Sequence, residues 1–468
     1  MRTTKGLVAA MEDEGETQSS QLAESTSSQS SQQPQESSAP ESSSSEPTQS
    51  DPASSQSVAT EELDLNEDLN EVNEASDDIN QANNDSDELV KHVSNLENTL
   101  PNDGASQQTI KVVNIAAEAI YKRLGINAKL PALENFATRT SRKYYTPIAI
   151  EGFSDVLNNI GNAVSSALRK AWQMFLEFLK RAKDYLVGLY ERIYQKFSKT
   201  KIEIKGLKQP TNNSSQTLAV QAPAPAVFEI EGLGISDILG VDKFAGLQLN
   251  FNNIENSSKL ITKILEVDVL SNADIFLKMK MTPEELPTGI KKFKWFDSSG
   301  MSKASDQQNE PGFGLYELFT LNYNRYYIKA PTELKEGLEG IKAARQTTIV
   351  EMKSDKTVTE VTSLNETEKQ TAIELMNKIT NVCIEFQRNT ARSDGAFKGI
   401  LNALVIAEGT LKRNKQHYGN KHSATIMSIY QCYKHLFNNI GIKTSSLFVK
   451  ELLDTSGSLS KWISRSSI

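Results

Sequence analysis

The sequence has little cysteine, little histidine and no long hydrophobic run. Its 468 residues include two cysteines, Cys383 and Cys432, and four histidines. Two cysteines do not make the disulfide framework of a small secreted protein. No apolar run is long enough to cross a bilayer, and residues 1–10 have too short an apolar core for a secretory signal. These absences predict assembly in a reducing cytoplasm.

Motifs of the common catalytic classes are also missing. The chain has no Gly-rich phosphate loop of either familiar form and no Gly-x-Ser-x-Gly elbow. Cys432 and His435 are three residues apart, with His417 and His422 nearby, and two zinc ligands at that spacing share one helical face. Cys432 also continues an apolar face, however, and no second cysteine pair completes a site. We therefore expect no metal, no cofactor and no enzymatic activity.

One aromatic cluster, around Arg325, has two interpretations. It consists of Tyr316, Phe319, Tyr323, Tyr326 and Tyr327. Such rings stack on bases in proteins that bind single-stranded nucleic acid, but they also pack in ordinary cores. We expect packing within the fold.

Charge is distributed unevenly along the chain. Residues 1–100 carry 22 acidic and 3 basic side chains, a net of −19, so the total of −8 leaves +11 on residues 101–468. Residues 17–59 are mostly Ser, Gln, Pro and Glu, a composition that predicts disorder. Residues 61–100 add a sparse apolar repeat, typical either of a weak acidic helix that needs a partner or of a solvated arm. Residues 1–105 are thus an acidic, low-complexity arm.

The remaining chain divides into four segments with a mainly α fold. Residues 106–151 contain a short helix, ended by Gly125, and a basic connection over 127–148 with two prolines. Residues 152–208 are a basic amphipathic helix, 209–227 a Pro/Ala-rich linker, and 228–468 a mainly helical domain with a minor β element. In that domain we expect helices at 257–265, 366–388, 397–411, 423–437 and 445–453, and strands at 318–328 and 347–361.

The segment from Gly152 gives the strongest local signal. Apolar residues recur every three or four positions from Phe153 to Phe197, which predicts one helical stripe, with Gly161 and Gly188 as weak points. Such a helix suits either a bilayer surface or burial against the C-terminal domain, and we expect burial. Its polar face becomes basic, and the candidate DNA-binding residues there are Arg169, Lys170, Lys180, Arg181, Lys183, Arg192 and Lys196.

A short peptide with a small residue, an apolar residue and then Glu recurs in the chain. It ends at Glu12, Glu134, Glu151 and Glu231, and Asn135 and Gly152 follow the second and third of these. Several copies stand in linkers or at element boundaries, where a protease reaches extended backbone. Pro147 biases Thr146 away from helix, so we expect extended backbone just before Glu151.

Three peptides in order carry a family resemblance. They are residues 119–126 (AIYKRLGI), 130–136 (LPALENF) and 148–153 (IAIEGF), and a basic amphipathic helix follows them. With the acidic arm, this arrangement resembles the internal head proteins of giant tailed phages of the phiKZ kind, over about residues 105–205. The resemblance implies that a prohead protease cuts after Glu in a small-x-Glu context and removes a propeptide. Glu231 departs from that pattern, because Glu229 stands where a small residue is preferred.

The resemblance also implies a location and partners. The protein would lie inside the capsid of the virion, after assembly in the host cytoplasm with other capsid and core proteins. A cut after Glu151 would separate 26 acidic and 10 basic side chains, a net of −16, from a remainder of +8. Packaged double-stranded DNA would hold that remainder without sequence preference, through counterion release. A membrane surface is the alternative partner of the basic helix.

Overall fold

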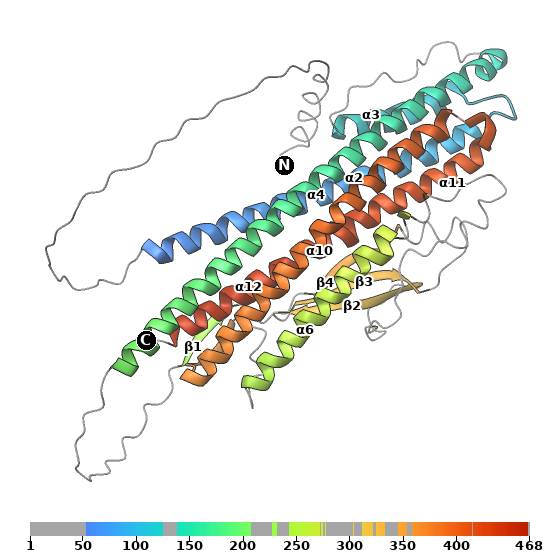
Figure 1. Cartoon of the computed structure of the whole chain (residues 1–468). Coiled ribbons are helices and arrows are strands. Elements are labelled where there is room, and N and C mark those ends of the chain that lie inside the picture. The colour runs from blue at the N-terminus through green and yellow to red at the C-terminus, as the bar shows by residue number, and fades with distance from the viewer. Residues whose placement is uncertain are drawn as a thin grey trace, which may run out of the picture.

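The structure is a computed structural model that describes residues 53–124, 138–206, 227–231, 243–271, 311–321, 324–332, 345–352, 358–413 and 415–466, with a few single positions between them. These residues form long helices and a small amount of antiparallel sheet (Figure 1). The predicted fold class, mainly α with a minor β element, is confirmed. Residues 1–52 of the acidic arm lie outside the described residues.

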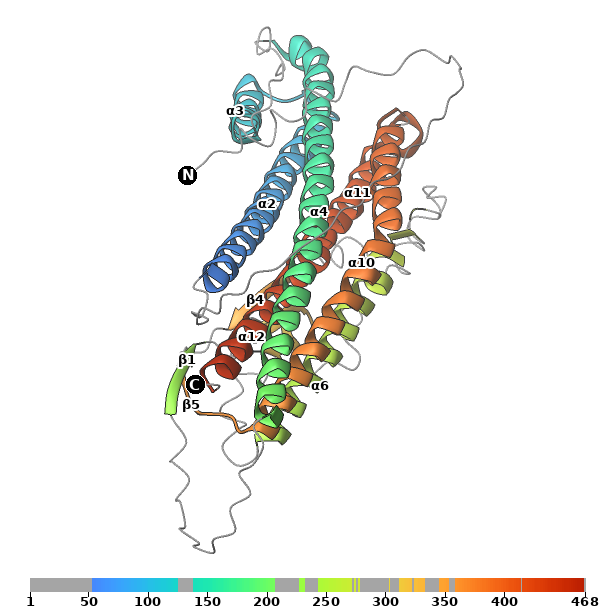
Figure 2. The same cartoon turned by 60° about the vertical axis from the view of Figure 1, so that its left-hand side comes forward.

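Three helices form the N-terminal part: α2 (Ala53–Glu97), α3 (Gln107–Leu124) and α4 (Arg139–Gly206). The 68 residues of α4 extend about 100 Å at 1.5 Å per residue. Figures 1 and 2 show α2 lying alongside α4. The helix α4 runs through Gly161 and Gly188, and it begins within the predicted connection at 127–148. The second half of that connection is therefore helical, which corrects the prediction.

The C-terminal part combines long helices with two π-helical segments. Its helices are α6 (Lys243–Lys263), α10 (Glu366–Arg413), α11 (Lys415–Leu436) and α12 (Thr444–Arg465), and its π-helices are η1 (Ile264–Ser271) and η3 (Phe437–Lys443). The helices predicted at 366–388 and 397–411 are one continuous helix, α10. Gly395, which stands between the two predicted helices, does not break it.

In the part of the chain that the structure describes, the β-structure consists of two small antiparallel sheets. β1 (Val227–Glu231) pairs with β5 (Val358–Thr362), and β2 (Phe313–Leu321), β3 (Asn324–Pro331) and β4 (Thr348–Met352) pair in that order. The strand predicted at 318–328 therefore spans a hairpin. The one predicted at 347–361 covers β4 and most of β5, which belong to different sheets.

The apolar stripe of α4 is buried in the core that α4 shares with α10 and α12. The Trp172 ring stacks on Phe397 of α10 with 4.3 Å between centroids, and its Nε1 donates to Asp394 Oδ1 at 2.9 Å. Burial against the C-terminal domain, the expected alternative, is what the structure has. A bilayer would reach this face only after α4 separated from its neighbours. Among the described helices, none is long and apolar enough to span a membrane.

The aromatic cluster around Arg325 also packs within the fold. Phe319 and Tyr326 are buried with ring centroids 4.5 Å apart, and Phe319 contacts Phe448 of α12 at 5.7 Å. The Tyr326 hydroxyl donates to Glu451 Oε1 at 2.6 Å. Burial and the neighbouring carboxylates of Glu451 and Glu351 raise the pKa of Tyr326. The expectation of packing is confirmed for these two rings.

Candidate functional site: an acidic helix on a basic helix

The two N-terminal helices that lie side by side have opposite charge. α2 carries 13 acidic side chains and one basic one, whereas α4 carries 13 basic and six acidic ones. One face of α2 is apolar and buried: Leu65, Leu69, Val72, Ala75, Ile79, Ala82, Leu89, Val93 and Leu96. Residues 61–100 had two interpretations, and the structure agrees with the first of them: they belong to an acidic helix that packs against a partner. That partner includes α4.

Two of the candidate DNA-binding residues form ion pairs with α2. Arg181 donates to Asp68 Oδ1 at 2.6 Å, and Arg192 lies 3.4 Å from Glu61 Oε2. A cavity of about 300 Å³ between the two helices is lined by Arg181, by the Arg192–Glu61 pair, and by Asp64, Leu65, Asp184, Tyr185 and Gly188. In this structure the two arginines therefore already have anionic partners.

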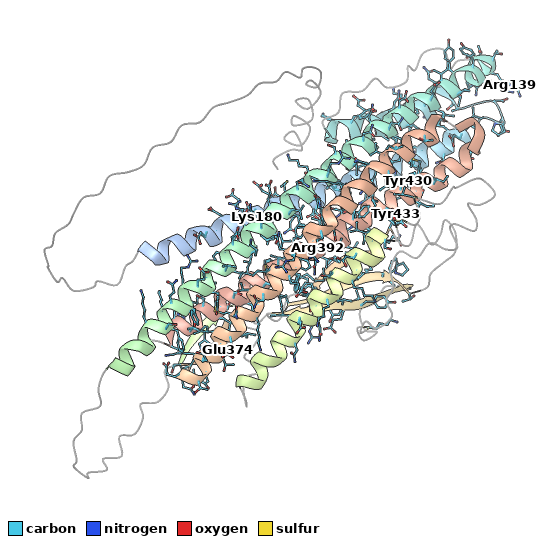
Figure 3. The ribbon with its side chains drawn as sticks, viewed as in Figure 1. Arg139, Lys180, Glu374, Arg392, Tyr430 and Tyr433 are labelled. Atoms are coloured by element: carbon cyan, nitrogen blue, oxygen red, sulfur yellow. The ribbon has the colours of Figure 1, made fainter. Side chains whose placement is uncertain are left out.

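Of the other five candidate DNA-binding residues, three are exposed to solvent and two contact other side chains of the protein. Lys170, Lys180 and Lys196 are exposed, and Figure 3 labels Lys180 on α4. Arg169 donates to Asn402 Oδ1 of α10 at 2.7 Å. Lys183 lies 2.9 Å from the carboxylate of the adjacent Asp184. The basic side chains of α4 therefore do not form one uninterrupted surface, because acidic residues alternate with them.

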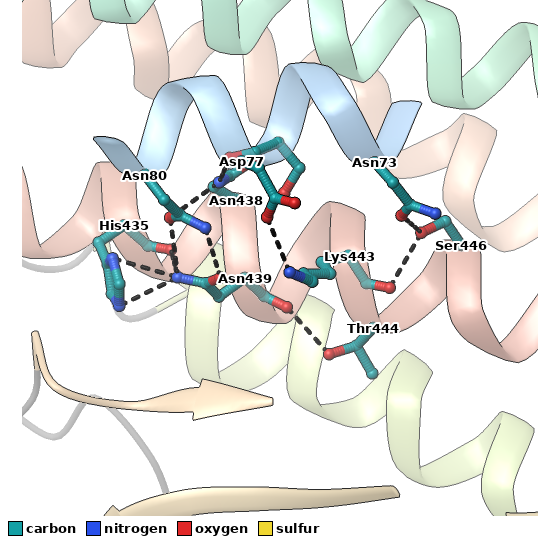
Figure 4. Close-up of polar contacts among 10 residues, drawn as sticks. Asn73, Asp77, Asn80, His435, Asn438, Asn439, Lys443, Thr444 and Ser446 are labelled. Atoms are coloured by element: carbon teal, nitrogen blue, oxygen red, sulfur yellow. Dashed lines mark hydrogen bonds and ion pairs between the residues drawn. The ribbon is translucent and has the colours of Figure 1, made fainter. Parts of the chain in front are cut away.

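The C-terminal half of α2 contacts η3 through a layer of amides (Figure 4). The Asn438 side-chain amide donates to the Ser76 carbonyl at 2.7 Å and to Asn80 Oδ1 at 3.0 Å. Asn80 in turn donates to Asn439 Oδ1 at 3.0 Å. At the solvent edge, Lys443 pairs with Asp77 at 2.9 Å. Amide pairs of this kind fix the register of two helices, since a shift of one turn leaves buried polar groups without partners.

The possible zinc ligands Cys432 and His435 are used differently. His435 Nε2 donates to the Thr347 carbonyl at 2.9 Å, and its Nδ1 accepts from the Asn439 amide at 3.1 Å. Burial lowers the pKa of His435 to about 4, and burial raises the pKa of Cys432 to about 12. His435 is therefore a neutral hydrogen-bonding residue at neutral pH. No group of three or more potential ligands occurs among the described residues, and the side chains of His417 and His422 lie outside them.

Glu151 and Gly152 lie inside α4, and not on extended backbone. The helix continues from Arg139 through Pro147 and past the Glu151–Gly152 bond. Glu151 is exposed, but Ala149, Ile150 and Phe153 beside it are buried. The expectation of extended backbone is thus wrong for the folded chain. A protease that binds extended substrates reaches this bond only when the first turns of α4 open, or before they form.

The turn between α2 and α3 holds this end of α4. The Ala105 N–H donates to Thr146 Oγ1 at 2.9 Å, and Asp103 pairs with Arg139, which Figure 3 labels at the start of α4. Gly104 has a φ of +75°, a region that glycine tolerates, and a Cβ there would lie 2.7 Å from the Arg142 carbonyl oxygen. The segment that contains the candidate cut is therefore anchored by residues far earlier in the chain.

The other candidate cleavage positions differ in context. Glu12, Glu134 and Asn135 lie outside the described residues. Glu231 ends β1, where it pairs with Val358 of β5, and the carbonyl of Glu229 accepts a hydrogen bond from Arg465 at 2.6 Å. A cut at Glu231 would therefore interrupt a paired strand.

Several residues of this site carry no signal in the sequence. Asp68 and Glu61 belong to a long acidic run, and nothing local separates them from their neighbours. Asn80 and Asn438 are polar residues of the kind expected in loops. Only the apolar repeat of Leu65, Leu69 and Val72 indicates that this run has an inner face.

The fold and the site define a class: an elongated, mainly helical protein in which an acidic helix is bound to a basic one. The family model of phiKZ-like phage internal head proteins matches residues 60–215, a third of the chain. The match confirms the family resemblance and indicates a structural protein of the head interior. It begins inside α2, so the acidic helix belongs to the matched unit together with α3 and α4. No curated protein and no solved structure gave a significant match.

Proposed function

We propose that this protein is a noncatalytic internal head protein that is made as a precursor, cut after Glu151 in the prohead and retained with packaged DNA. One observation carries the proposal: the pairs Arg181–Asp68 and Arg192–Glu61 connect the two sides of that cut. The two carboxylates that pair with these arginines, Asp68 and Glu61, both precede Gly152. Removing the acidic segment would leave the basic side chains of the remaining chain available to the phosphates of DNA. Such side chains bind DNA with release of the counterions that surround it.

The partners in this proposal are the prohead protease, other proteins of the head core and double-stranded DNA. The acidic arm would keep the precursor from binding nucleic acid before packaging, because an attached polyanion competes for the same basic residues. Among the described residues, the apolar face of α4 is covered by its neighbours, so the membrane alternative needs α4 to detach first.

The cut itself gives the first prediction. Protein extracted from purified particles is expected to begin at Gly152, and Glu151→Gln is expected to abolish this cut, because the protease requires the carboxylate. If the position after Glu134 is still used, the mutant chain begins at Asn135. Mass spectrometry of the extracted protein measures the new N-terminus. Glu177→Gln, an exposed glutamate of the same helix, is the control; a wild-type virion protein that still carries residues 1–151 would refute the precursor hypothesis.

The second prediction concerns DNA affinity. Binding of the particle-derived protein to duplex DNA is expected to fall steeply with salt and to show no sequence preference. If Arg181 and Arg192 contact phosphates, the double variant Arg181→Ala with Arg192→Ala makes the plot of log binding constant against log salt concentration less steep by about 2. Fluorescence anisotropy between 50 and 200 mM salt measures this slope. Arg388→Ala with Arg392→Ala, exposed residues of α10, removes equal charge elsewhere; salt-independent binding of the wild type would contradict retention by DNA electrostatics.

A further inference from the structure

The contacts of α2 raise the question of what happens to it after the chain is cut. Its ion pairs and amide contacts described above are all made with residues beyond Gly152: Arg181, Arg192, Asn438, Asn439 and Lys443. None of these contacts depends on the peptide bond between Glu151 and Gly152. A cut there removes the covalent connection and leaves this interface in place.

The apolar part of the interface is too extensive to separate readily in water. Leu69, Val72, Ile79 and Leu89 are each at most 3% exposed, and they belong to the same buried core as the stripe of α4. Separating α2 would return this whole face to water, which is unfavourable in proportion to its apolar area. That contribution does not weaken when salt is added.

The polar contacts of the interface fix the position of α2 more than they add to the stability of its binding. Arg181 and its partner Asp68 are 54% and 22% exposed, and such pairs are weak and screened by salt. The amide layer holds a single register, but several buried atoms on it lack a hydrogen bond, including Ser76 Oγ, Asn83 Nδ2 and Gln431 Oε1. Water satisfies these groups when the helices part. The apolar face therefore supplies most of the stability of the interface, and the polar contacts fix the position of α2.

We infer that α2 remains docked between α4 and η3 after the cut, and that its carboxylates stay paired with Arg181 and Arg192 until it is displaced. The occupant of this surface is the chain's own acidic helix, held without a covalent bond. Cleavage is then the step that makes displacement possible, and release of α2 is the step that frees the two arginines from these carboxylates. This inference rests on the proposed function for the cut and for DNA as the competing polyanion.

The test uses the full chain with a site-specific protease sequence inserted between Glu134 and Asn135, in the segment between α3 and α4. After complete cutting, the two pieces are expected to co-elute 1:1 in size-exclusion chromatography at both 0.15 and 1 M NaCl. Leu69→Asp places a charge in the apolar seam and is expected to release the N-terminal piece. Leu63→Asp is the matched control, because Leu63 is 69% exposed on the same helix, and its pieces stay together.

Two further measurements keep the outcomes separate. Glu61→Lys with Asp68→Lys reverses the charge of the two partners of Arg192 and Arg181 and leaves the apolar seam unchanged, so it tests docking even where Leu69→Asp fails to fold. It is expected to weaken retention about tenfold at low salt and little at 1 M. Duplex DNA is expected to bind the cut, still-docked complex as weakly as the uncut chain, and the released C-terminal piece at least about tenfold more tightly.

Pieces that separate on cutting at 0.15 M NaCl would overturn the docking inference, whatever the DNA result. Tight DNA binding by the docked complex would overturn the inference that pairing with α2 keeps the arginines from DNA. If the pieces stay docked and neither docked nor released protein binds DNA, docking stands, whereas retention by DNA in the proposed function and the role of the arginines both fail.

Discussion

Replacing Lys434 with Met is expected to lower the free energy of unfolding by about 3–5 kcal/mol. Lys434 Nζ lies 2.8 Å from Glu408 Oε1, and the two side chains are 1% and 7% exposed. The same nitrogen donates to the Gly161 carbonyl at 3.2 Å. The pair therefore joins α4, α10 and α11 at one buried point, and the substitution leaves the Glu408 carboxylate there without its cation. Urea denaturation followed by circular dichroism measures the loss.

A double substitution distinguishes the cost of an unpaired buried charge from the contribution of the pair itself. Lys434→Met with Glu408→Leu removes both charges, and buried pairs replaced in this way often cost little or nothing. The double variant is thus expected to recover most of the stability lost by Lys434→Met. Lys450→Met is the matched control, because its pair with Asp454 is partly exposed and is expected to contribute at most about 1 kcal/mol. Equal losses in Lys434→Met and Lys450→Met would contradict the assignment of the buried pair.

Gly161 shows why this point of the core is invisible in the sequence. The Gly161 carbonyl accepts from Lys434, and the Glu408 carboxylate lies in van der Waals reach of Gly161. In the sequence the same residue marks a weak point of a helix. Its two neighbours, Glu408 and Lys434, are far along the chain and belong to helices identified there only by their apolar faces.

The features that the sequence predicts well are periodic ones. The rhythm from Phe153 to Ile193 predicts the buried face of α4, because a stripe at helical spacing has only one way to leave water. The opposite charge of the two parts of the chain can likewise be counted from the sequence. The sequence does not predict individual ion pairs, because whether Arg181 meets Asp68 or water depends on the rotation of two helices about each other.

Local rules fail in this chain where distant contacts outweigh them. Pro147 and the residue before it predict extended backbone, yet both lie within α4. Thr146 is fully buried and accepts the Ala105 N–H, while Ala149 and Ile150 pack into the core. Burial of these residues compensates the cost of the proline. The sequence does not predict the buried amides of η3 for the same reason. Asn438 and Asn439 are favourable there only because Ser76 and Asn80 lie opposite them.

Pro147 remains a defect in the helix, and its place one turn before Glu151 leads to the largest expected effect on processing. Proline has no N–H to donate to the Lys143 carbonyl, and its ring crowds that carbonyl, which costs about 3 kcal/mol in a helix interior. Pro147→Ala removes this cost and stabilises the closed helix. If the protease cuts an opened segment, the open population and the cutting rate fall together, by about 100-fold for 3 kcal/mol.

The measurement is a time course of cleavage after Glu151, together with amide hydrogen exchange of residues 148–156. Pro147→Ala is expected to slow both the cleavage and the exchange. Pro101→Ala, an exposed residue in the turn between α2 and α3, is the control and is expected to leave both unchanged. If exchange slows and cleavage keeps its wild-type rate, opening of the folded helix does not limit the cut, and processing acts on chains in which the start of α4 has not yet formed.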